Sequence, residues 1–559
     1  MPPPTESPIG RRALLRTGAG LTAALAAGPL LTACGDGGTA ARPGIRSEKL
    51  LPSTTVRNAG VEPDLPGTAE GVPPGFFRYP AKPRRSVEGR PLAGAEPVSA
   101  VMETFAPPPA GRDRNAAWQA IERRLGGTVD LTAVPADDYP SKFSTMIAAN
   151  HLPDLFMYPE TGGVDNMAGF LDATCADLTP FLAGDRIRRY PNLAAVPKDA
   201  WRKAVYNGKL YGIPITRGIT GGAGFYRHDL FAEAGVTDLD QITGLDRFVE
   251  LCKELTRPAE DRYAIMASVT NLLAMSAGAP YLWRMDTRTG RFTADLETDE
   301  YRFAVETARK LQQAGCFYPG SLGMSGAQKA RYTDMFKNGK AAYVYDGMPP
   351  YLTPGTGYVA TMAAVDKKYD PRPMVPFGPG AVAWTDNLSL STTFVKKAPA
   401  ARVEQLLALA DFVAAPFGSE EYTLINYGVG GTDFTRDGKG NPVLTERGTQ
   451  DVAAPWKMLA STVPAVFSAE SAAGVRHVHA AYTKLIPMLA PDPALTVFSP
   501  TWEAKGTGSL HTLKQDGLKD IVSGREPMSA YDDLVKEYLA RGAEKARAEF
   551  EEALQKGKR

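Results

Sequence analysis

The sequence predicts an α/β fold, in which a largely parallel sheet is covered by helices on both faces and the chain forms more than one core. From about residue 97 onwards, short apolar strand patterns alternate with amphipathic helix patterns, which is typical of parallel sheets. The chain has 559 residues, 43% of them hydrophobic, which is too long for one core and rich enough to fill two or more.

The alternation is clearest near the start of the globular region. Apolar runs at 98–105 and 153–158 and an alternating pattern at 128–134 predict strands. Amphipathic patterns at 112–125 and 138–150 predict helices that bury one face each.

Later segments continue the pattern. Strands are predicted at 209–214 and 224–226, helices at 229–234, 246–255, 299–314 and 403–414, and a long C-terminal helix capped by Ser529. Turn sequences at 286–290 and 436–440 lie between short strands. The second is shorter than an EF-hand loop and lacks its bidentate Glu, which favours a hairpin over a calcium site.

The N-terminus predicts export. Residues 1–33 carry Arg11 and Arg12 before an apolar run, and the sequence Leu-Thr-Ala precedes Cys34 like a lipobox. The paired arginines resemble a twin-arginine signal, but the export route stays open. We expect a signal peptide at 1–33 and a mature protein lipidated at Cys34; an ordinary export signal with a chance cysteine is the alternative.

Residues 34–96 are rich in Pro, Gly, Ala and Arg and lack a helix or strand period. Such a composition predicts a lipid-anchored linker rather than a core. Its later part, 71–83, carries Phe76, Phe77 and Tyr79, and we expect that part to lie extended against the body.

Three further cysteines, Cys175, Cys252 and Cys316, form no CxxC motif. Cys252 lies on the apolar face of the helix predicted at 246–255, which indicates a buried thiol. One disulfide among the three stays open, because the compartment is oxidising.

The motifs of common enzymes are missing from this sequence. There are five histidines, no HExxH and no GxSxG, and the glycine-rich run at 428–431 lacks a P-loop lysine. His477 and His479 favour a solvated pair over a metal pair. The net charge of +1 indicates no nucleic-acid partner. We expect no enzyme activity, no metal and no cofactor.

Six segments carry a resemblance to a known family. They are 207–214 (NGKLYGIP), 225–231 (FYRHDLF), 336–343 (FKNGKAAY), 422–434 (YTLINYGVGGTDF), 441–443 (NPV) and 524–533 (GREPMSAYDD). In their order and spacing, and together with the lipobox, they resemble the extracellular solute-binding lipoproteins of bacterial ABC importers. The likeness is closest to the LplA-like, oligosaccharide-associated subgroup and covers about residues 97–554. Gly430 departs from the pattern, because many relatives carry an acidic residue there.

The resemblance implies a two-lobed, periplasmic-binding-protein-like fold joined by hinge crossovers. It implies lobe 1 at 97–222 and 343–394 and lobe 2 at 226–340 and 398–559. It also implies a monomer on the outer face of the cell membrane, attached by its lipid alone. Such a protein captures an oligosaccharide between the lobes and delivers it to the transmembrane subunits of an ABC permease.

A saccharide site needs aromatic rings for the C–H faces of pyranoses and planar polar groups for the hydroxyls. Residues of these types in predicted loops are the ligand-binding candidates, with ordinary packing as the alternative for each. The candidates are Tyr158, Trp283, Tyr345, Asp346, Trp384, Asp386, Asn387 and Tyr427. Trp118 and Trp201 are assigned to packing.

Two other functions remain open. A receptor for peptides or another solute could use the same scaffold, with a charged pocket for chain termini. A polysaccharide lyase or hydrolase is the third possibility, but paired carboxylates cannot be recognised without coordinates.

Overall fold

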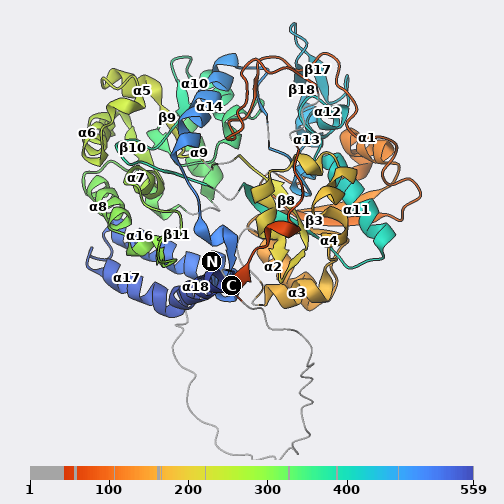
Figure 1. The fold of residues 1–559 in the computed structure, drawn as a ribbon. Helices are drawn as coiled ribbons and strands as arrows, with labels where there is room; N and C mark the ends of the chain where they lie inside the picture. Colours follow the sequence, from red (N-terminus) through yellow and green to blue (C-terminus); the bar gives the residue numbers. More distant parts are fainter. Residues whose placement is uncertain are drawn as a thin grey trace, which may run out of the picture. The chain divides into compact units, whose positions relative to one another are not determined.

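The computed structural model describes residues 43–557, except for 56–59, 106, 160–163, 165, 219, 221, 325–327, 386–387 and 464. The predicted signal at 1–33, Cys34, Asp386 and Asn387 therefore lie outside the described residues. Residues 40–559 form one unit, which contains two α/β lobes (Figure 1). Within the described part, no helix is both long enough and apolar enough to cross a membrane.

Lobe 1 is built on a five-stranded sheet in the order β4-β3-β5-β16-β8. β3 is parallel to β4 and β5, whereas β16 is antiparallel to β5 and β8. Gly212 allows the last pairing, because a Cβ there would lie 2.1 Å from Thr392 Cγ2. The strands are β3 (Val98–Thr104), β4 (Val129–Pro135), β5 (Leu155–Met157), β8 (Gly212–Thr216) and β16 (Ser389–Val395).

Amphipathic helices cover this sheet. In α1, Asn115 accepts a hydrogen bond from the Trp118 amide at 2.8 Å, and Gly126 ends the helix in the left-handed region. The face between these caps buries Trp118, Ile121 and Leu125 in the lobe 1 core. The helices are α1 (Ala116–Leu125), α2 (Tyr139–Ala148), α3 (Met167–Thr174), α4 (Thr179–Leu182), α11 (Ala400–Val413), α12 (Glu420–Tyr427) and α13 (Glu446–Asp451).

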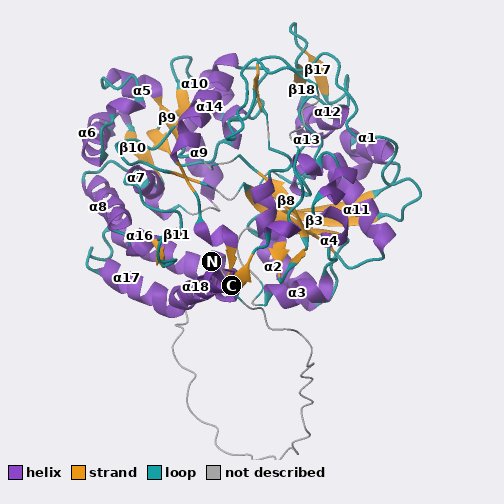
Figure 2. Cartoon of the chain, in the orientation of Figure 1, coloured by secondary structure: helices purple, strands orange, loops and turns teal. Residues whose placement is uncertain are grey.

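Lobe 2 is built on a four-stranded sheet in the order β10-β13-β9-β14. β10 and β13 are parallel, and β9 is antiparallel to β13 and β14. Figure 2 shows these strands among the surrounding helices. The strands are β9 (Phe225–Arg227), β10 (Tyr263–Met266), β13 (Ala341–Val344) and β14 (Pro371–Pro373).

The helices of lobe 2 bury stripes at helical spacing. α8 begins at the Thr298 cap and buries Tyr301, Ala304, Ala308 and Leu311. The helices are α5 (His228–Glu233), α6 (Leu245–Leu255), α7 (Thr270–Ser276), α8 (Asp299–Gln313), α9 (Lys329–Lys337), α10 (Tyr358–Val365) and α14 (Ala472–Leu485).

The C-terminal helices complete lobe 2 and differ from the single long helix that the sequence predicts. The helix is interrupted at Gly542, whose φ of 153° is not helical. The Ser529 side chain makes no capping hydrogen bond. The glycine lets the chain turn so that Phe550 packs against Trp283 and Trp502. The helices are α15 (Pro500–Lys505), α16 (His511–Ser523), α17 (Ala530–Tyr538) and α18 (Glu544–Gly557).

Short strand pairs join the remaining segments. The two predicted hairpins around 286–290 and 436–440 are confirmed as β11–β12 and β17–β18. The pairs are β6 (Val205–Tyr206) with β7 (Lys209–Leu210), β11 (Trp283–Met285) with β12 (Phe292–Ala294), β17 (Phe434–Arg436) with β18 (Pro442–Leu444), β15 (Ala383–Trp384) with β20 (Leu489–Ala490), β1 (Gly44–Ile45) with β21 (Val497–Phe498), and β2 (Gly75–Phe76) with β19 (Val466–Phe467).

The lobes divide the chain differently from the predicted boundaries. The sequence predicts 343–394 in lobe 1, but β14 pairs with β9 and Trp384 packs in the lobe 2 core. It also predicts 398–559 in lobe 2, but α11 packs in the lobe 1 core. Strand and helix patterns identify the elements, but which sheet each one joins depends on pairing that a single sequence does not reveal.

The described residues between 43 and 96 form an N-terminal strap that is packed on the body. Leu51 and Leu92 are buried in the lobe 1 core, and Val72 is buried in the lobe 2 core. Phe76 and Tyr79 contact Phe417 in a third, aromatic cluster. The expectation that 71–83 lies extended against the body is therefore confirmed, and the linker is structured over much more of its length than its composition predicts.

Candidate functional site

The ends of the lobe 1 strands bring several candidate side chains to one edge. β3, β4, β5 and β8 all run in the same direction, so their carboxyl ends meet there, beside the start of β16. Phe105 follows β3, Tyr158 follows β5, Arg217 follows β8 and Leu388 precedes β16. We call this the lobe 1 edge. Ligands of open α/β sheets generally bind beyond the carboxyl ends of strands.

The lobe 2 sheet has a matching edge. β10 and β13 end there, followed by Ala267 and Tyr345, and β9 begins there. After β8 the chain leaves the lobe 1 edge and enters lobe 2 at β9; it returns from β15 in lobe 2 to β16. Two residues at these ends, Ala267 and Leu388, have φ values of 63° and 53°. Left-handed backbone at non-glycine residues is costly and is often found at functional sites.

Phe105 is the most exposed large hydrophobic residue in the described part of the chain, with 55% of its surface accessible. The Arg217 guanidinium carbon lies 5.8 Å from the centroid of its ring, within cation–π range. The backbone amide of Arg217 donates to the Leu388 carbonyl at 3.1 Å, which ties the first crossing to the second. An open aromatic face beside a cation is suited to stacking a sugar ring.

Lys457 adds a second positive charge at this edge. It lies in a short 3₁₀ helix, Trp456–Met458. Thr393 Oγ1, on β16, donates to the Met458 carbonyl at 3.3 Å, and the Ser461 hydroxyl donates to the Thr216 carbonyl at 3.1 Å. The Lys457 side chain is exposed, yet surrounding protein and the charge of Arg217 lower the pKa of its ammonium group.

Of the predicted ligand residues, Tyr158, Tyr345 and Asp346 lie at these two edges. The Tyr158 ring packs edge-on against Phe394 at 6.0 Å, and burial raises the pKa of its hydroxyl to about 12. Tyr345 is half-buried against the lobe 2 core. Both oxygens of Asp346 are already used, because Tyr358 donates to one at 2.8 Å and Lys329 contacts the other at 2.6 Å.

The other predicted ligand residues are packed or undescribed. Trp384 is 8% exposed, and its indole N–H donates to the Ala279 carbonyl at 2.8 Å. Trp283 is 1% exposed among the aromatic rings of the lobe 2 core, and Tyr427 is buried in the cluster with Tyr79. In this conformation none of these three rings has a face open to a ligand. Asp386 and Asn387 lie outside the described residues.

Phe105, Arg217 and Lys457 were not among the sequence candidates. Phe105 is the last residue of the strand predicted at 98–105, so the signal for it was its position at a strand's carboxyl end. Arg217 follows the predicted strand at 209–214 and could have been found in the same way. Lys457 carries no such signal, because contacts with β8 and β16 bring it to the edge.

The described residues show no cluster of three His, Cys, Asp or Glu side chains able to hold a metal. His477 and His479 lie on α14 with separate partners, Tyr351 Oη at 3.1 Å and the Pro66 carbonyl at 3.0 Å. Cys175, Cys252 and Cys316 are buried free thiols. Burial raises the pKa of Cys252 and so opposes its reactivity.

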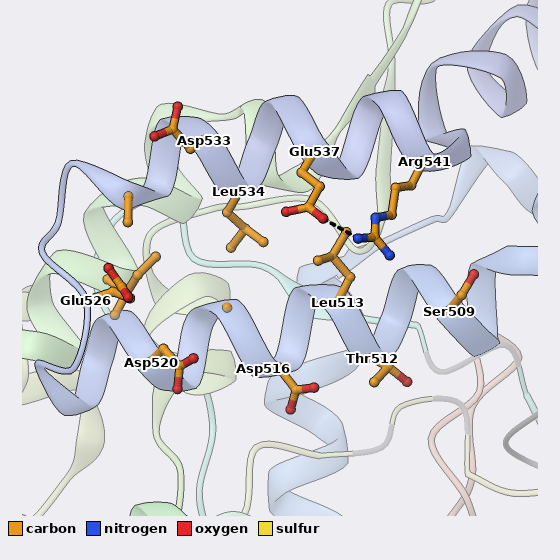
Figure 3. A pocket seen from close by; sticks show the side chains of 13 residues that line it. Ser509, Thr512, Leu513, Asp516, Asp520, Glu526, Asp533, Leu534, Glu537 and Arg541 are labelled. Carbon is orange, nitrogen blue, oxygen red and sulfur yellow. Dashed lines mark ion pairs between the residues drawn. The ribbon is translucent and has the colours of Figure 1, made fainter. Parts of the chain in front are cut away.

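A groove of about 640 Å³ lies between α16 and α17 (Figure 3). Its walls carry many acidic side chains, and its floor includes Leu513 and Leu534. Three of the acids have basic partners, in the pairs Asp520–Arg525, Asp533–Lys536 and Glu537–Arg541. The groove contains none of the strand-end residues, and we assign it no role.

Comparison with known proteins identifies the family. The model for bacterial extracellular solute-binding proteins matches residues 116–427, which is more than half of the chain. The chain belongs to this family. The predicted two-lobed α/β fold and the predicted family are thereby confirmed.

Individual relatives are distant. The lipoprotein LipO of Bacillus subtilis is 24% identical over 45% of this chain, and the match spans about half (51%) of LipO. The polygalacturonan/rhamnogalacturonan-binding protein YtcQ of Bacillus subtilis is 22% identical over 80% of this chain and 89% of YtcQ. The crystal structure of the N-glycan transport solute-binding protein NgtS from Streptococcus pneumoniae has a TM-score of 0.59 and 14% identity, covering 82% of this chain and 98% of NgtS. This last similarity shows the fold.

Proposed function

We propose that this protein is the solute-capturing subunit of an ABC importer and that its solute is an oligosaccharide. It holds the saccharide between the lobe 1 and lobe 2 edges and delivers it to the transmembrane subunits of the permease. The observation that carries this proposal is the open face of Phe105 beside Arg217, at the strand ends of a solute-binding fold. YtcQ and NgtS, named for binding or transporting saccharides, support the class of solute.

The mechanism rests on differential binding. A saccharide that contacts both edges favours the state in which the lobes are closed, and so shifts the population toward it. In this role the protein binds and releases its ligand chemically unchanged. A panel of plant and microbial oligosaccharides incubated with the protein should therefore stay intact.

Calorimetric titration with this panel tests the proposal, and Phe105→Ala tests the site. Loss of the stacking ring should cost roughly 1–3 kcal/mol, which is about one to two decades in Kd. The melting temperature without ligand should stay unchanged, because Phe105 is 55% exposed and contributes little to the core.

Phe303→Ala is the matched control. Phe303 is 40% exposed on α8, and Lys310 Nζ lies 6.0 Å from its ring, so this pair also combines an exposed phenyl ring with a nearby cation, away from the strand ends. The control should bind as the parent protein does. Equal affinities for the two variants would remove Phe105 from the site, and no affinity for any saccharide would contradict the proposed function.

A peptide receptor is the second candidate, because Arg217 and Lys457 could bind a C-terminal carboxylate. A peptide would also bring an N-terminal ammonium, which needs a carboxylate at matching distance. Short peptides therefore belong in the titration panel, and tight peptide binding without saccharide binding would establish this alternative.

We further propose that the protein is anchored at the outer face of the membrane through lipidated Cys34, after removal of residues 1–33. Changing Cys34 to Ser removes the thiol that carries the lipid, so the protein should leave the membrane fraction. Fractionation of cells that express the two forms measures this. A Ser variant that stays in the membrane fraction would contradict the anchor. Relatives named as a lipoprotein and as extracellular solute-binding proteins support this location.

A further inference from the structure

The N-terminal strap passes from lobe 2 to lobe 1 at Arg46. Before Arg46, β1 pairs with β21 and packs beside α18 of lobe 2. After it, Glu48 forms ion pairs with Lys198 and Arg202 of lobe 1, and Leu51 enters the lobe 1 core. The strap is therefore fixed to a different lobe on each side of this one residue.

The guanidinium group of Arg46 joins the two lobes directly. Its side chain is 6% exposed, and its Nη1 donates to the Arg202 carbonyl of lobe 1 at 2.7 Å. Its Nη2 is paired with Glu503 on α15 of lobe 2, and its Nε donates to the Val497 carbonyl at 3.3 Å. A rigid, planar fork can hold partners in several directions at once, which a single ammonium group does less well.

Both ends of this connection are held firmly by their own lobes. Beside Glu503, Thr501 Oγ1 donates to Glu549 of α18 at 2.8 Å, which fixes α15 to the rest of lobe 2. At the other end, Arg202 belongs to the 3₁₀ helix Lys198–Ala204, whose Trp201 is fully buried in the lobe 1 core. Arg46 thus connects two packed bodies, and a change in their relative position must stretch or break its contacts.

The connection lies near the lobe 1 edge. The Val164 amide donates to Tyr158 Oη at 3.3 Å, and α3 begins at Met167, shortly after it in the chain. α3 in turn packs beside α15, which carries Glu503. Opening of the lobes at this seam therefore moves α15 away from the side of the edge where Tyr158 lies.

We propose that Arg46 is a latch between the lobes: its simultaneous bonds to the Arg202 carbonyl and to Glu503 hold the lobes together, and opening at this seam requires that one of these bonds break. A hydrogen bond is lost once its heavy atoms are more than about 3.5 Å apart, so a small hinge motion is enough. The strap then helps to set the balance between open and closed states. The inference goes beyond solute capture, because it concerns the protein without ligand.

The distance between the lobes tests the latch. Lys142→Cys on α2 and Asp246→Cys on α6 place one spin label on an exposed position of each lobe. The mature chain carrying Cys34→Ser is used, and its three other cysteines are buried. Pulsed electron paramagnetic resonance then measures the distance distribution without ligand. We expect Arg46→Met to shift this distribution by several ångström toward longer distances.

Glu503→Ala removes only the lobe 2 end of the latch. Its side chain is 22% exposed, and the Thr501 contact that fixes α15 remains, so this variant tests the latch even if Arg46→Met does not fold. It should shift the distribution as Arg46→Met does. The double variant should shift it no further, because both changes remove the same contact.

Arg402→Met is the matched control. The Arg402 side chain is 16% exposed, donates to the Glu96 and Pro97 carbonyls at 2.9 and 2.8 Å, and pairs with Asp154 at 2.9 Å. It therefore makes the same kinds of contact as Arg46, but all of its partners belong to lobe 1 or to the end of the strap that leads into β3. The control should keep the distance distribution of the parent protein.

Two results would overturn the latch. The first is a distance distribution that stays unchanged in Glu503→Ala and in Arg46→Met, since the lobes would then be held by other contacts. The second is an equal shift in Arg402→Met, which would show that loss of any buried arginine loosens the protein.

Discussion

At the scale of single residues, Asp492 should make the stability of this protein depend on pH. It is 5% exposed and caps a short 3₁₀ helix, Pro493–Thr496, by accepting from the Ala494 amide at 2.9 Å. Burial raises the pKa of its carboxyl to about 7, although Lys203 and Arg46 oppose the shift. In the unfolded chain an Asp has a pKa of about 3.9. Between these values the folded protein holds a proton that the unfolded chain releases.

The contribution of the Asp492 carboxyl to the free energy of unfolding should therefore be largest at low pH. It should fall as the pH rises through the window from about 4 to about 7. The slope is at most about 1.4 kcal/mol per pH unit for one proton. Asp492→Asn keeps an oxygen for the cap and cannot ionise. Urea titration at several pH values measures the free energy of unfolding of the variant and of the parent protein. The Asn variant should gain stability relative to the parent as the pH rises across that window.

Asp238→Asn is the matched control. Asp238 also caps a short helix, accepting from the Asp240 amide at 2.9 Å, but hydrogen bonding and Lys484 lower its pKa. The stabilisation that the Asp238 carboxylate provides is fully present above the pKa that an Asp has in the unfolded chain. It is lost only as the pH falls below that value. The control difference should therefore stay flat between about pH 5 and 7. Parallel profiles for the two variants in this window would show that Asp492 does not hold the extra proton.

The site residues show how far single residues can be predicted from a sequence. Tyr158 and Tyr345 lie at strand ends, as predicted, because each directly follows an apolar strand that is visible in the sequence pattern. Trp283, Trp384 and Tyr427 have the right chemistry for a sugar site, but the structure buries their rings. Residue type alone does not show whether a ring is buried, and Phe105, whose ring is exposed at a strand end, was treated as part of a strand.

At the scale of elements, the helices that the sequence predicted at 112–125, 138–150, 229–234, 246–255, 299–314 and 403–414 lie within a few residues of observed ones, whereas others, such as α7 and α12, were not predicted. The helices at α6 and α8 and the strands at β3 and β4 have strong local periods, and local periods survive without tertiary information. The break at Gly542 was missed because the apolar stripe continues across it. The assignment of β14 and α11 to lobes was also missed, because strand pairing and core membership depend on contacts between distant segments.

At the scale of the whole molecule, the N-terminal strap is part of the folded body and not only a tether. Arg46 donates to the Arg202 carbonyl of lobe 1 at 2.7 Å and forms an ion pair with Glu503 on α15 of lobe 2. Leu51, Val72 and Phe76 fill positions in three separate cores. A composition rich in Pro and Gly did not predict this packing. Such a segment can still insert single apolar side chains into cores that other elements build.

Removing the strap should therefore destabilise the protein. A chain of residues 97–559 exposes the cores that Leu51, Leu92, Val72, Phe76 and Tyr79 now cover. Each such side chain contributes about 1.5–3 kcal/mol of burial, and a typical domain is stable by only about 5–15 kcal/mol. We expect a much lower melting temperature and binding of a hydrophobic dye, whereas a chain of residues 43–559 should melt like the mature protein. If both truncated chains melt at the same temperature, the strap contributes nothing to stability, because the cores are complete without it.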